Sequence, residues 1–298
     1  PSEIGKSCLT PLISVFGGVA GDATVTRISN DEFWVVSSGI SERYQQRFYN
    51  SVQLPEKTSF QSRTEEMCGF NIAGPKSREI LQRLSNQDLS SKNWSFMRSG
   101  ILSIAGVNCL ALRISFTGDL GWELYCEANK QQIVYKALVQ EAVNEKGGPV
   151  GSRALMSLRI EKGYGSWSRE YSPEVWPHEC GLDKLCKLNK DFLNKEKLEK
   201  NLNNKPRENL VLIHLNEDDC NSSNADATGG EPIFKNGKGL GRITSGAYGY
   251  TVGMSLALGY AKDVLPGDTV DVMVLGQPHR GKVLEAPPFD PEGKILRG

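Results

Sequence analysis

The first forty residues alternate between short apolar runs and groups of glycine or polar residues. The apolar runs cover residues 12–16, 25–28 and 33–36. Runs of this length, separated by turn residues, predict a β-meander over residues 8–40. Apolar side chains at helical spacing then predict a helix over residues 41–54.

The middle of the chain mixes both periodicities. A short strand at 70–73 leads into a helix that opens at Pro75, because proline is favoured at the first helical position. Alternation of apolar and polar residues predicts further strands throughout 101–126. Helical spacing predicts three more helices, over 129–146, 152–162 and 191–202. The aromatic and irregular stretch 163–192 is expected to be a loop packed over a site.

From Leu210 to about Leu284, short strands alternate with Gly, Pro and Asn turns, which predicts a small all-β barrel. The polar, acidic residues 217–230 are expected to form a mobile loop. The strand–helix–strand–strand–helix order upstream suggests a split βαβ, ferredoxin-like unit. The predicted class is therefore α+β. Three domains are expected, comprising the meander with its helix, the ferredoxin-like unit and the barrel, at 1–60, 61–200 and 201–298.

Composition narrows the classes of partner. Lys+Arg and Asp+Glu balance at 35 each in 298 residues. Zero net charge argues against non-specific nucleic-acid binding and against a polybasic membrane anchor. No run of about 18 apolar residues is present, so no membrane span is predicted. The chain starts with Pro1 and without a signal-peptide pattern, and we expect the natural protein to begin further upstream.

The seven cysteines are scattered and form no CxxC pair, which favours reduced thiols in a reducing compartment. The three histidines lie far apart, which argues against a zinc site or a Ser–His–Asp triad. Glycine-rich nucleotide loops and the GxSxG motif are absent as well. Generic motifs therefore do not identify the chemistry.

Asp22 is the first candidate for chemistry. It follows the glycine-rich turn at 17–21, where backbone can approach a ligand closely. A carboxylate held there could act on a proton or a developing cation. Taken alone, however, the segment is better explained as a capped hairpin turn.

Glu123 is the second candidate. It stands between Trp122 and Leu124 in an expected strand, so its side chain faces away from theirs. An inward-facing carboxylate needs partners, because unpaired burial is costly. The guanidine-like edge of a heterocycle would satisfy both oxygens. Alternatively, Glu123 faces water, or it pairs with Arg113 or Arg159.

Arg159 is the third candidate. It lies on an expected helix just before an aromatic-rich loop that contains Trp167 and Tyr171. An arginine there could hold an anionic ligand tail while a ring stacks on the ligand. A charged helix surface with aromatic core packing explains the same residues equally well.

Taken in order, these segments resemble the aminomethyltransferase (glycine-cleavage T-protein) family. Within it they are most similar to the C-terminal folate domains of dimethylglycine and sarcosine dehydrogenases. The matching segments, which cover nearly the whole chain, are 17–27, 72–78, 114–125, 157–164, 179–182, 187–192, 241–250 and 288–291. The order and spacing of these segments are specific, although no single motif is decisive.

The resemblance implies a cloverleaf of domains around a central folate channel, with tetrahydrofolate as the cofactor and no metal. Asp22 would be the family's acid near the reactive nitrogens of the folate. Glu123 would grip the pterin edge, and Arg159 corresponds to an arginine of the folate site. The other folate contacts implied are Phe116, Ser38, Tyr125 and Trp167.

The resemblance also implies the source of the carbon. In the dehydrogenases an FAD domain oxidises an N-methyl group, and the iminium or formaldehyde converts tetrahydrofolate to 5,10-methylenetetrahydrofolate. The implied partners are a reduced folate and a flavin dehydrogenase domain or subunit, with FAD present only if a separate upstream domain supplies it. The implied location is the bacterial cytoplasm or the mitochondrial matrix.

Three departures from the family pattern matter. Phe116 stands where the dehydrogenases usually have Tyr, and Ser38 stands where T-proteins tend to have Asn, which favours the dehydrogenase branch. As the third departure, the family's first strand–helix unit would precede Pro1 and is not part of this sequence.

Two alternative functions stay open. One is a stand-alone aminomethyltransferase served by a lipoyl carrier protein, or a folate-dependent demethylase. The other is a non-catalytic folate-binding protein.

Overall fold

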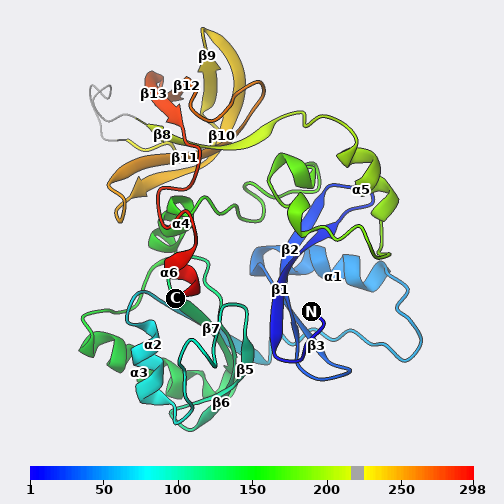
Figure 1. Cartoon of the computed structure of the whole chain (residues 1–298), viewed down its shortest axis with the longest axis vertical. Coiled ribbons are helices and arrows are strands. Elements are labelled where there is room, and N and C mark those ends of the chain that lie inside the picture. The colour runs from blue at the N-terminus through cyan, green and yellow to red at the C-terminus, as the bar shows by residue number, and fades with distance from the viewer. Residues whose placement is uncertain (216–224) are drawn as a thin grey trace.

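The computed structural model describes residues 1–215 and 225–298. The described part forms three bodies arranged as a cloverleaf, comprising two sheets with helices and one barrel (Figure 1). The predicted α+β class is confirmed. Most of the loop expected over 217–230 lies outside the described residues, and 225–230 is irregular.

The first body is the predicted β-meander. Its antiparallel sheet has the order β1-β2-β3. The strands are β1 (Lys6–Ile13), β2 (Val19–Arg27) and β3 (Phe33–Ser37), and they lead through the short 3-10 helix η1 (Gly39–Ser41) into α1 (Glu42–Ser51). The helix expected over 41–54 is therefore confirmed.

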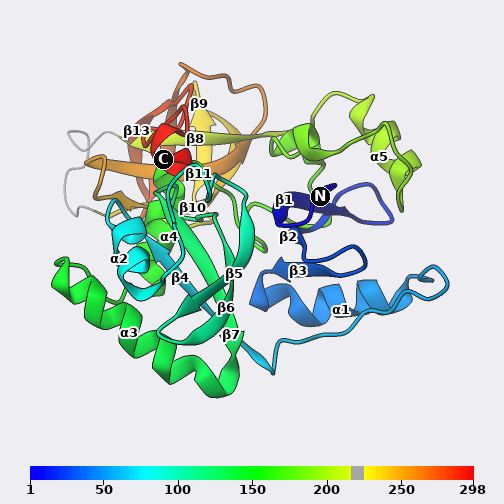
Figure 2. The same cartoon turned by 60° about the horizontal axis from the view of Figure 1, so that its bottom comes forward.

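The second body is an antiparallel four-stranded sheet in the order β4-β7-β6-β5. Its elements are β4 (Met67–Ala73), α2 (Ser77–Leu84), β5 (Ser99–Ile104), β6 (Val107–Leu112), β7 (Gly121–Glu127), the 3-10 helix η2 (Ala128–Lys130) and α3 (Gln131–Asn144). Both long helices cover one face of the sheet (Figure 2). Leu81 of α2 and Val134 of α3 are fully buried there, against the strand residues Leu102 and Leu124.

The two bodies share a topology that the sequence does not reveal. In each, a three-stranded antiparallel meander is followed by a 3-10 turn and an α-helix, so that β1-β2-β3-η1-α1 corresponds to β5-β6-β7-η2-α3. The second body adds β4 beside β7, with α2 after it. The strand that ends the first meander, β3, is therefore the topological counterpart of β7.

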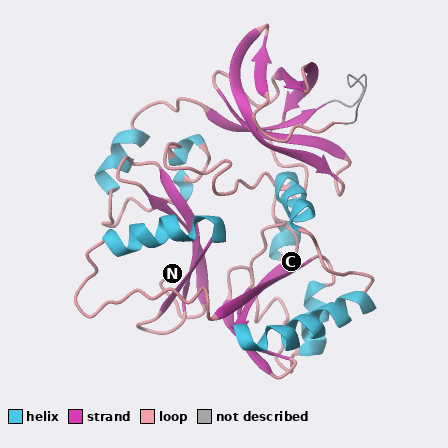
Figure 3. Ribbon diagram, turned by 180° about the vertical axis from the view of Figure 1, so that it is seen from behind, coloured by secondary structure: helices cyan, strands magenta, loops and turns pink. Residues whose placement is uncertain are grey.

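The segment after α4 (Ser152–Glu161) returns to the first sheet. It contains the 3-10 helices η3 (Pro177–Glu179) and η4 (Asp183–Leu185) and ends in α5 (Lys195–Leu202). Asn194 and Asn201 donate hydrogen bonds to the carbonyls of Ile13 and Phe16, both at 2.8 Å. Figure 3 shows this part of the chain from behind. The expected range 61–200 therefore contains the four-stranded sheet and also a later segment that packs on the first sheet.

The third body is the predicted barrel. Six strands close in the order β10-β11-β8-β13-β12-β9. The strands are β8 (Asn209–Leu215), β9 (Pro232–Lys235), β10 (Lys238–Gly249), β11 (Met254–Ala261), β12 (Thr269–Val274) and β13 (Gln277–Val283). Buried aliphatic side chains such as Ile213, Ile233 and Val272 fill the interior. The chain then leaves the barrel and ends in α6 (Lys294–Arg297), next to the four-stranded sheet (Figure 1).

Two further observations bear on the sequence analysis. The cysteines of the described part are free, and Cys220 lies outside it. Among the described residues, no helix combines the length and the apolar character that a membrane crossing requires.

Candidate functional site

Glu123 lies near the middle of β7, on the sheet face that the helices leave uncovered. Its neighbours Trp122 and Leu124 are completely buried in the core beneath α2 and α3. Alternation therefore turns Glu123 and Tyr125 to the other face. On that face Tyr125 packs with Trp34 of β3 against a buried cluster around Leu112. The face of the second sheet that α2 and α3 leave uncovered is thus directed toward the first sheet.

The Glu123 carboxylate is half-buried and held by one neighbour. The Tyr125 hydroxyl donates to Oε2 of Glu123 at 2.5 Å. Burial raises the pKa of Glu123, and the bond from Tyr125 offsets that rise in part. Arg113 and Arg159 bond elsewhere, and no described residue donates to Oε1 of Glu123. Oε1 is therefore left for a ligand or for water.

Asp22 lies within β2, opposite Pro11 of β1, and is half-buried. Burial raises its pKa, and its own backbone N–H lowers it in part. Within the described chain, its carboxylate has no partner from another residue. Burial raises the pKa of Tyr171, and the negative charges of Cys180 and then Asp22 raise it further.

Trp167 belongs to the loop that brings Tyr171 to this position. The backbones of Trp167 and Tyr171 form a β-bridge. The Trp167 ring stacks on Tyr44 of α1, with the centroids 5.5 Å apart. Val19 of β2 packs with Tyr171 and Trp167. The aromatic loop therefore covers the strand that carries Asp22.

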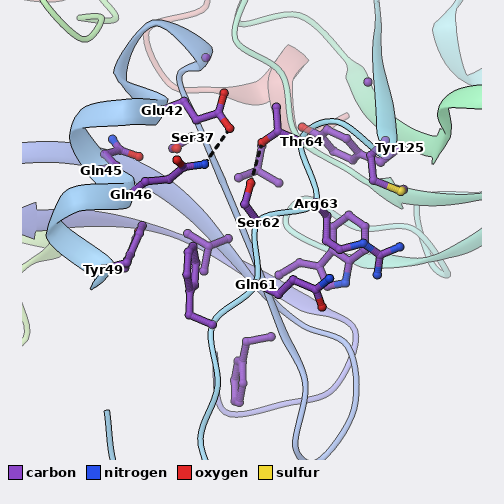
Figure 4. Close-up of a pocket in the computed structure, with 18 of the residues that line it drawn as sticks. Ser37, Glu42, Gln45, Gln46, Tyr49, Gln61, Ser62, Arg63, Thr64 and Tyr125 are labelled. Carbon is purple, nitrogen blue, oxygen red and sulfur yellow. Dashed lines mark hydrogen bonds between the residues drawn. The ribbon is translucent and has the colours of Figure 1, made fainter. Parts of the chain in front are cut away.

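A cavity of about 460 Å³ lies between β3, α1, residues 59–64 and the start of the second sheet. Ser38 and Tyr125 both line it. Figure 4 shows Tyr125 across the cavity from Glu42 and Gln46, which hydrogen-bond each other at 3.0 Å. Two of the predicted folate contacts therefore face one cavity, and Tyr125 links that cavity to Glu123.

Gln45 and Tyr49, on α1, line the same cavity and were not predicted. Gln45 is only 2% exposed, yet both of its amide atoms lack a partner in the described structure, as does the buried Tyr49 hydroxyl. A Cβ on Gly21 would lie 2.4 Å from the Gln45 amide nitrogen, so a residue with a side chain does not fit at 21 without movement. The apolar spacing of Tyr44, Phe48 and Val52 gives no signal for this buried amide.

Arg159 is completely buried, and other residues of the chain accept the hydrogen bonds of its terminal guanidinium nitrogens. Its guanidinium forms an ion pair with Glu170 at 2.8 Å and donates to the Tyr164 carbonyl at 2.8 Å and the Ser245 hydroxyl at 2.7 Å. It lines a second cavity, of about 750 Å³, between α4 and β10. Phe116 is also absent from the lining of the first cavity and stacks on Tyr164, with the ring centroids 6.5 Å apart. Of the predicted site residues, Ser38 and Tyr125 line the first cavity, whereas Asp22, Glu123, Trp167, Arg159 and Phe116 do not.

The described residues contain no group of three or more His, Cys, Asp or Glu side chains that could hold a metal ion. The groups that could take part in chemistry in and around the first cavity are the half-buried carboxylates of Asp22 and Glu123, the buried Gln45 amide and nearby aromatic rings.

Two family models match the chain. One is described as the GCVT N-terminal domain and matches residues 1–190. The other is described as the glycine cleavage T-protein C-terminal barrel domain and matches residues 209–290, where the six-stranded barrel lies. The two matches together leave few residues uncovered.

Named relatives agree with these models. The chain is 31% identical over 291 residues to dimethylglycine dehydrogenase, mitochondrial, of Homo sapiens, covering 96% of this chain and 33% of that protein. It is 32% identical over 285 residues to aminomethyltransferase of Thermotoga maritima, covering 95% and 74% respectively. The chain therefore spans about a third of the dehydrogenase relative's length.

One solved structure shows the same fold. The crystal structure of glycine cleavage system aminomethyltransferase T from Bartonella henselae matches with a TM-score of 0.82, over 97% of this chain and 77% of that chain. The sequence identity is 19%, so this likeness concerns the fold alone.

Arg159→Met tests the internal role of Arg159. The substitution leaves Glu170 buried without its cation, and losing one partner of a buried pair costs about 3–5 kcal/mol. We expect a loss of this size in urea unfolding. Arg242→Met is the control, because Arg242 pairs with Glu208 at the surface and is 56% exposed. Equal losses in the two variants would contradict the assignment.

Glu123→Gln should stabilise the protein at high pH. Since burial raises the folded-state pKa of Glu123 above its usual value of 4.5, the folded protein binds more protons in that window, and stability falls as pH rises through it. The melting temperature of the variant should exceed that of the wild type at about pH 8 and lose this advantage at about pH 4. Glu127→Gln, an exposed position on the same strand, is the control. A pH-independent difference would contradict the expectation.

Proposed function

The chain belongs to the glycine cleavage T-protein family, and from this we propose that it binds tetrahydrofolate and passes a one-carbon unit to it. The family is of the folate-dependent aminomethyltransferase type. In the proposed reaction, formaldehyde and tetrahydrofolate give 5,10-methylenetetrahydrofolate and water. With an iminium donor, the amine leaves instead of water. Tetrahydrofolate supplies the two nitrogens that receive the carbon.

Glu123 is the observation that carries this proposal. Its Oε2 is fixed by Tyr125, while Oε1 has no donor among the described residues. The amino-pyrimidine edge of a pterin offers adjacent N–H donors, which a carboxylate accepts in a fork geometry. Burial has already raised the pKa of Glu123, so a ligand that donates to the ionised form would relieve an unfavourable state. The free carboxylate oxygen of the site is therefore an acceptor suited to the N–H donors of a reduced folate.

Asp22 is proposed as the acid that handles the proton. It is half-buried, its pKa is raised by burial, and its carboxylate has no partner from another described residue. A carboxylate with a raised pKa exchanges a proton more readily near neutral pH. Asp22 would take or give the proton at the folate nitrogens and stabilise a cationic carbon.

The remaining predicted contacts have different proposed roles. Ser38 and Tyr125 would line the folate cavity, and Trp167, stacked on Tyr44, would offer an aromatic surface to the folate ring system. Arg159 and Phe116 would act from outside that cavity. The buried pair of Arg159 with Glu170 would fix the loop that carries Trp167.

The carbon donor is proposed to be an N-methyl amine of the dimethylglycine or sarcosine type. The support is the 31% identity to a dimethylglycine dehydrogenase, of which this chain spans 33%. A flavin dehydrogenase domain or subunit would then be the partner, in the bacterial cytoplasm or the mitochondrial matrix. The 32% identity to an aminomethyltransferase favours a second candidate, in which a lipoyl carrier protein delivers the carbon. Dependence of turnover on a lipoyl protein distinguishes the two.

Calorimetry with tetrahydrofolate tests the binding site. We expect wild-type binding, and we expect Glu123→Ala to weaken it by about 2–5 kcal/mol, because one partner of a buried charged hydrogen bond is lost. Glu127→Ala, on the exposed part of the same strand, should bind like the wild type. A folded wild-type chain that does not bind tetrahydrofolate would refute the proposal.

Rates with formaldehyde and tetrahydrofolate, corrected for the uncatalysed reaction, test turnover. Asp22→Asn should lower the enzymatic rate by about 10²–10⁴-fold, the usual contribution of a general acid or base. Its affinity for tetrahydrofolate should change little. Asp31→Asn, an exposed acid beyond the end of the same strand, is the control. Wild-type binding without any rate above background would instead support a non-catalytic folate-binding protein.

A further inference from the structure

The last fifteen residues form a strap, defined here as residues 284–298, that returns from the barrel to the four-stranded sheet. The Leu284 N–H donates to the Leu212 carbonyl of the barrel at 2.8 Å. Farther along, the Phe289 N–H donates to the Glu161 carbonyl at the end of α4 at 3.2 Å. Figure 1 shows the strap, in red, ending beside β7. The strap therefore connects the barrel, α4 and the four-stranded sheet that carries Glu123.

A buried ion pair anchors the strap. Lys162, just after α4, meets Asp290 at 2.9 Å, and their side chains are 6% and 4% exposed. Lys162 also donates to the Asp290 carbonyl, and the Asp290 carboxylate accepts the N–H groups of Ile295 and Leu296, each at 3.1 Å. Burial opposes ionisation of Asp290, but these donors lower its pKa to about 2. The Asp290 carboxylate is therefore ionised throughout the physiological range.

The Lys162 side chain supports residues 113–121, which form the loop between β6 and β7 together with the first residue of β7. A Cβ on Gly118 would lie 2.7 Å from Cδ of Lys162, and Gly118 has a φ of +85°. The loop backbone thus rests directly on the lysine stem. Two residues earlier, Phe116 stacks on Tyr164, which follows Lys162 by two positions. A shift of Lys162 would therefore move this loop.

The strap touches the same loop at its other end. Arg113 is completely buried and donates to the Leu296 carbonyl at 2.7 Å and the Gly121 carbonyl at 3.2 Å. Its guanidinium lies 4.8 Å from the centre of the Trp122 ring. Trp122 directly precedes Glu123. The strap therefore fixes both the loop and the start of the strand that carries Glu123.

We propose that the strap sets the position of residues 113–121 and of Glu123, so that Lys162 and Asp290 are positioning residues for folate binding. The ligand rests on the proposed function, whereas the positioning of the loop does not. Neither residue needs to touch the folate. Their effect would reach the folate through Gly118 and Arg113. A small displacement of the Glu123 carboxylate from its hydrogen-bonding position would weaken binding, because binding depends on exact placement of the interacting atoms.

The experiment combines tetrahydrofolate calorimetry with amide hydrogen exchange of residues 113–121 in Asp290→Asn. Asp268→Asn is a matched control, because Asp268 also pairs with a lysine, Lys235, at 2.6 Å and accepts a backbone N–H, but within the barrel. We expect Asp290→Asn to weaken tetrahydrofolate on the order of tenfold and to speed exchange in the loop. The control should leave both unchanged, even if its melting temperature falls.

A second pair of variants separates charge from packing. Lys162→Met keeps an apolar side chain against Gly118 but loses the ion pair, and it should behave like Asp290→Asn. Lys162→Arg keeps the charge and should restore most of the affinity. If every variant lowers the melting temperature while affinity and loop exchange stay at wild-type values, the strap is purely structural and the proposal is wrong. If the wild type binds no tetrahydrofolate but loop exchange responds as expected, the positioning stands and the proposed ligand is wrong.

Discussion

The ion pair between Arg159 and Glu170 is the constraint on which the arrangement of this protein depends. Burying two charges is costly unless their remaining hydrogen-bonding capacity is satisfied. Here Glu170 accepts not only from Arg159 but also from the Ser166 N–H and the Thr244 hydroxyl, and the Tyr260 hydroxyl donates to its carbonyl. These donors come from α4, from the aromatic loop and from two barrel strands. One charged centre therefore joins the barrel to the loop that packs Trp167 and Tyr171 against Val19, on the strand that carries Asp22.

The two candidate carboxylates, Asp22 and Glu123, have few hydrogen-bond donors, in contrast to Glu170. Glu123 has one donor, Tyr125, and Asp22 has no donor from another described residue, so burial raises the pKa of both. The fold thus satisfies the Glu170 carboxylate and leaves the two candidate acids under-satisfied. A ligand that donates hydrogen bonds would supply what the protein withholds, and this is the usual physical reason that perturbed acids gather at functional sites. The contrast also separates the two kinds of buried acid without reference to any relative.

Sequence reasoning was strongest where the information is local. Alternation along β7 was enough to turn Glu123 away from Trp122 and Leu124, and turn residues were enough to predict the meander and the barrel. It failed where partners are distant in the chain. Arg159 and Ser245 are 86 residues apart, and no spacing predicts their hydrogen bond. The buried side of α1 carries the amide of Gln45, which the apolar positions of that helix do not indicate. The shared topology of the two meanders was also hidden, because alternation constrains burial but leaves residue identity free.

That shared topology explains where the site's parts come from. Ser38 follows β3 directly and Tyr125 lies on β7, the counterpart of β3 in the second meander. Both residues line one cavity, so the candidate site takes one wall from corresponding strands of two similar units. If the two strands carried the same side chains, both sides of this cavity would have the same charge and polarity. The difference is made by Glu123, which lies on β7 and is under-satisfied, and by the strap, which contacts the loop before β7 through Leu296. The two similar units therefore differ in charge and in support around the cavity that they share, because Tyr125 on β7 donates to the Glu123 carboxylate and, among the described residues, no acid bonded in this way accompanies Ser38.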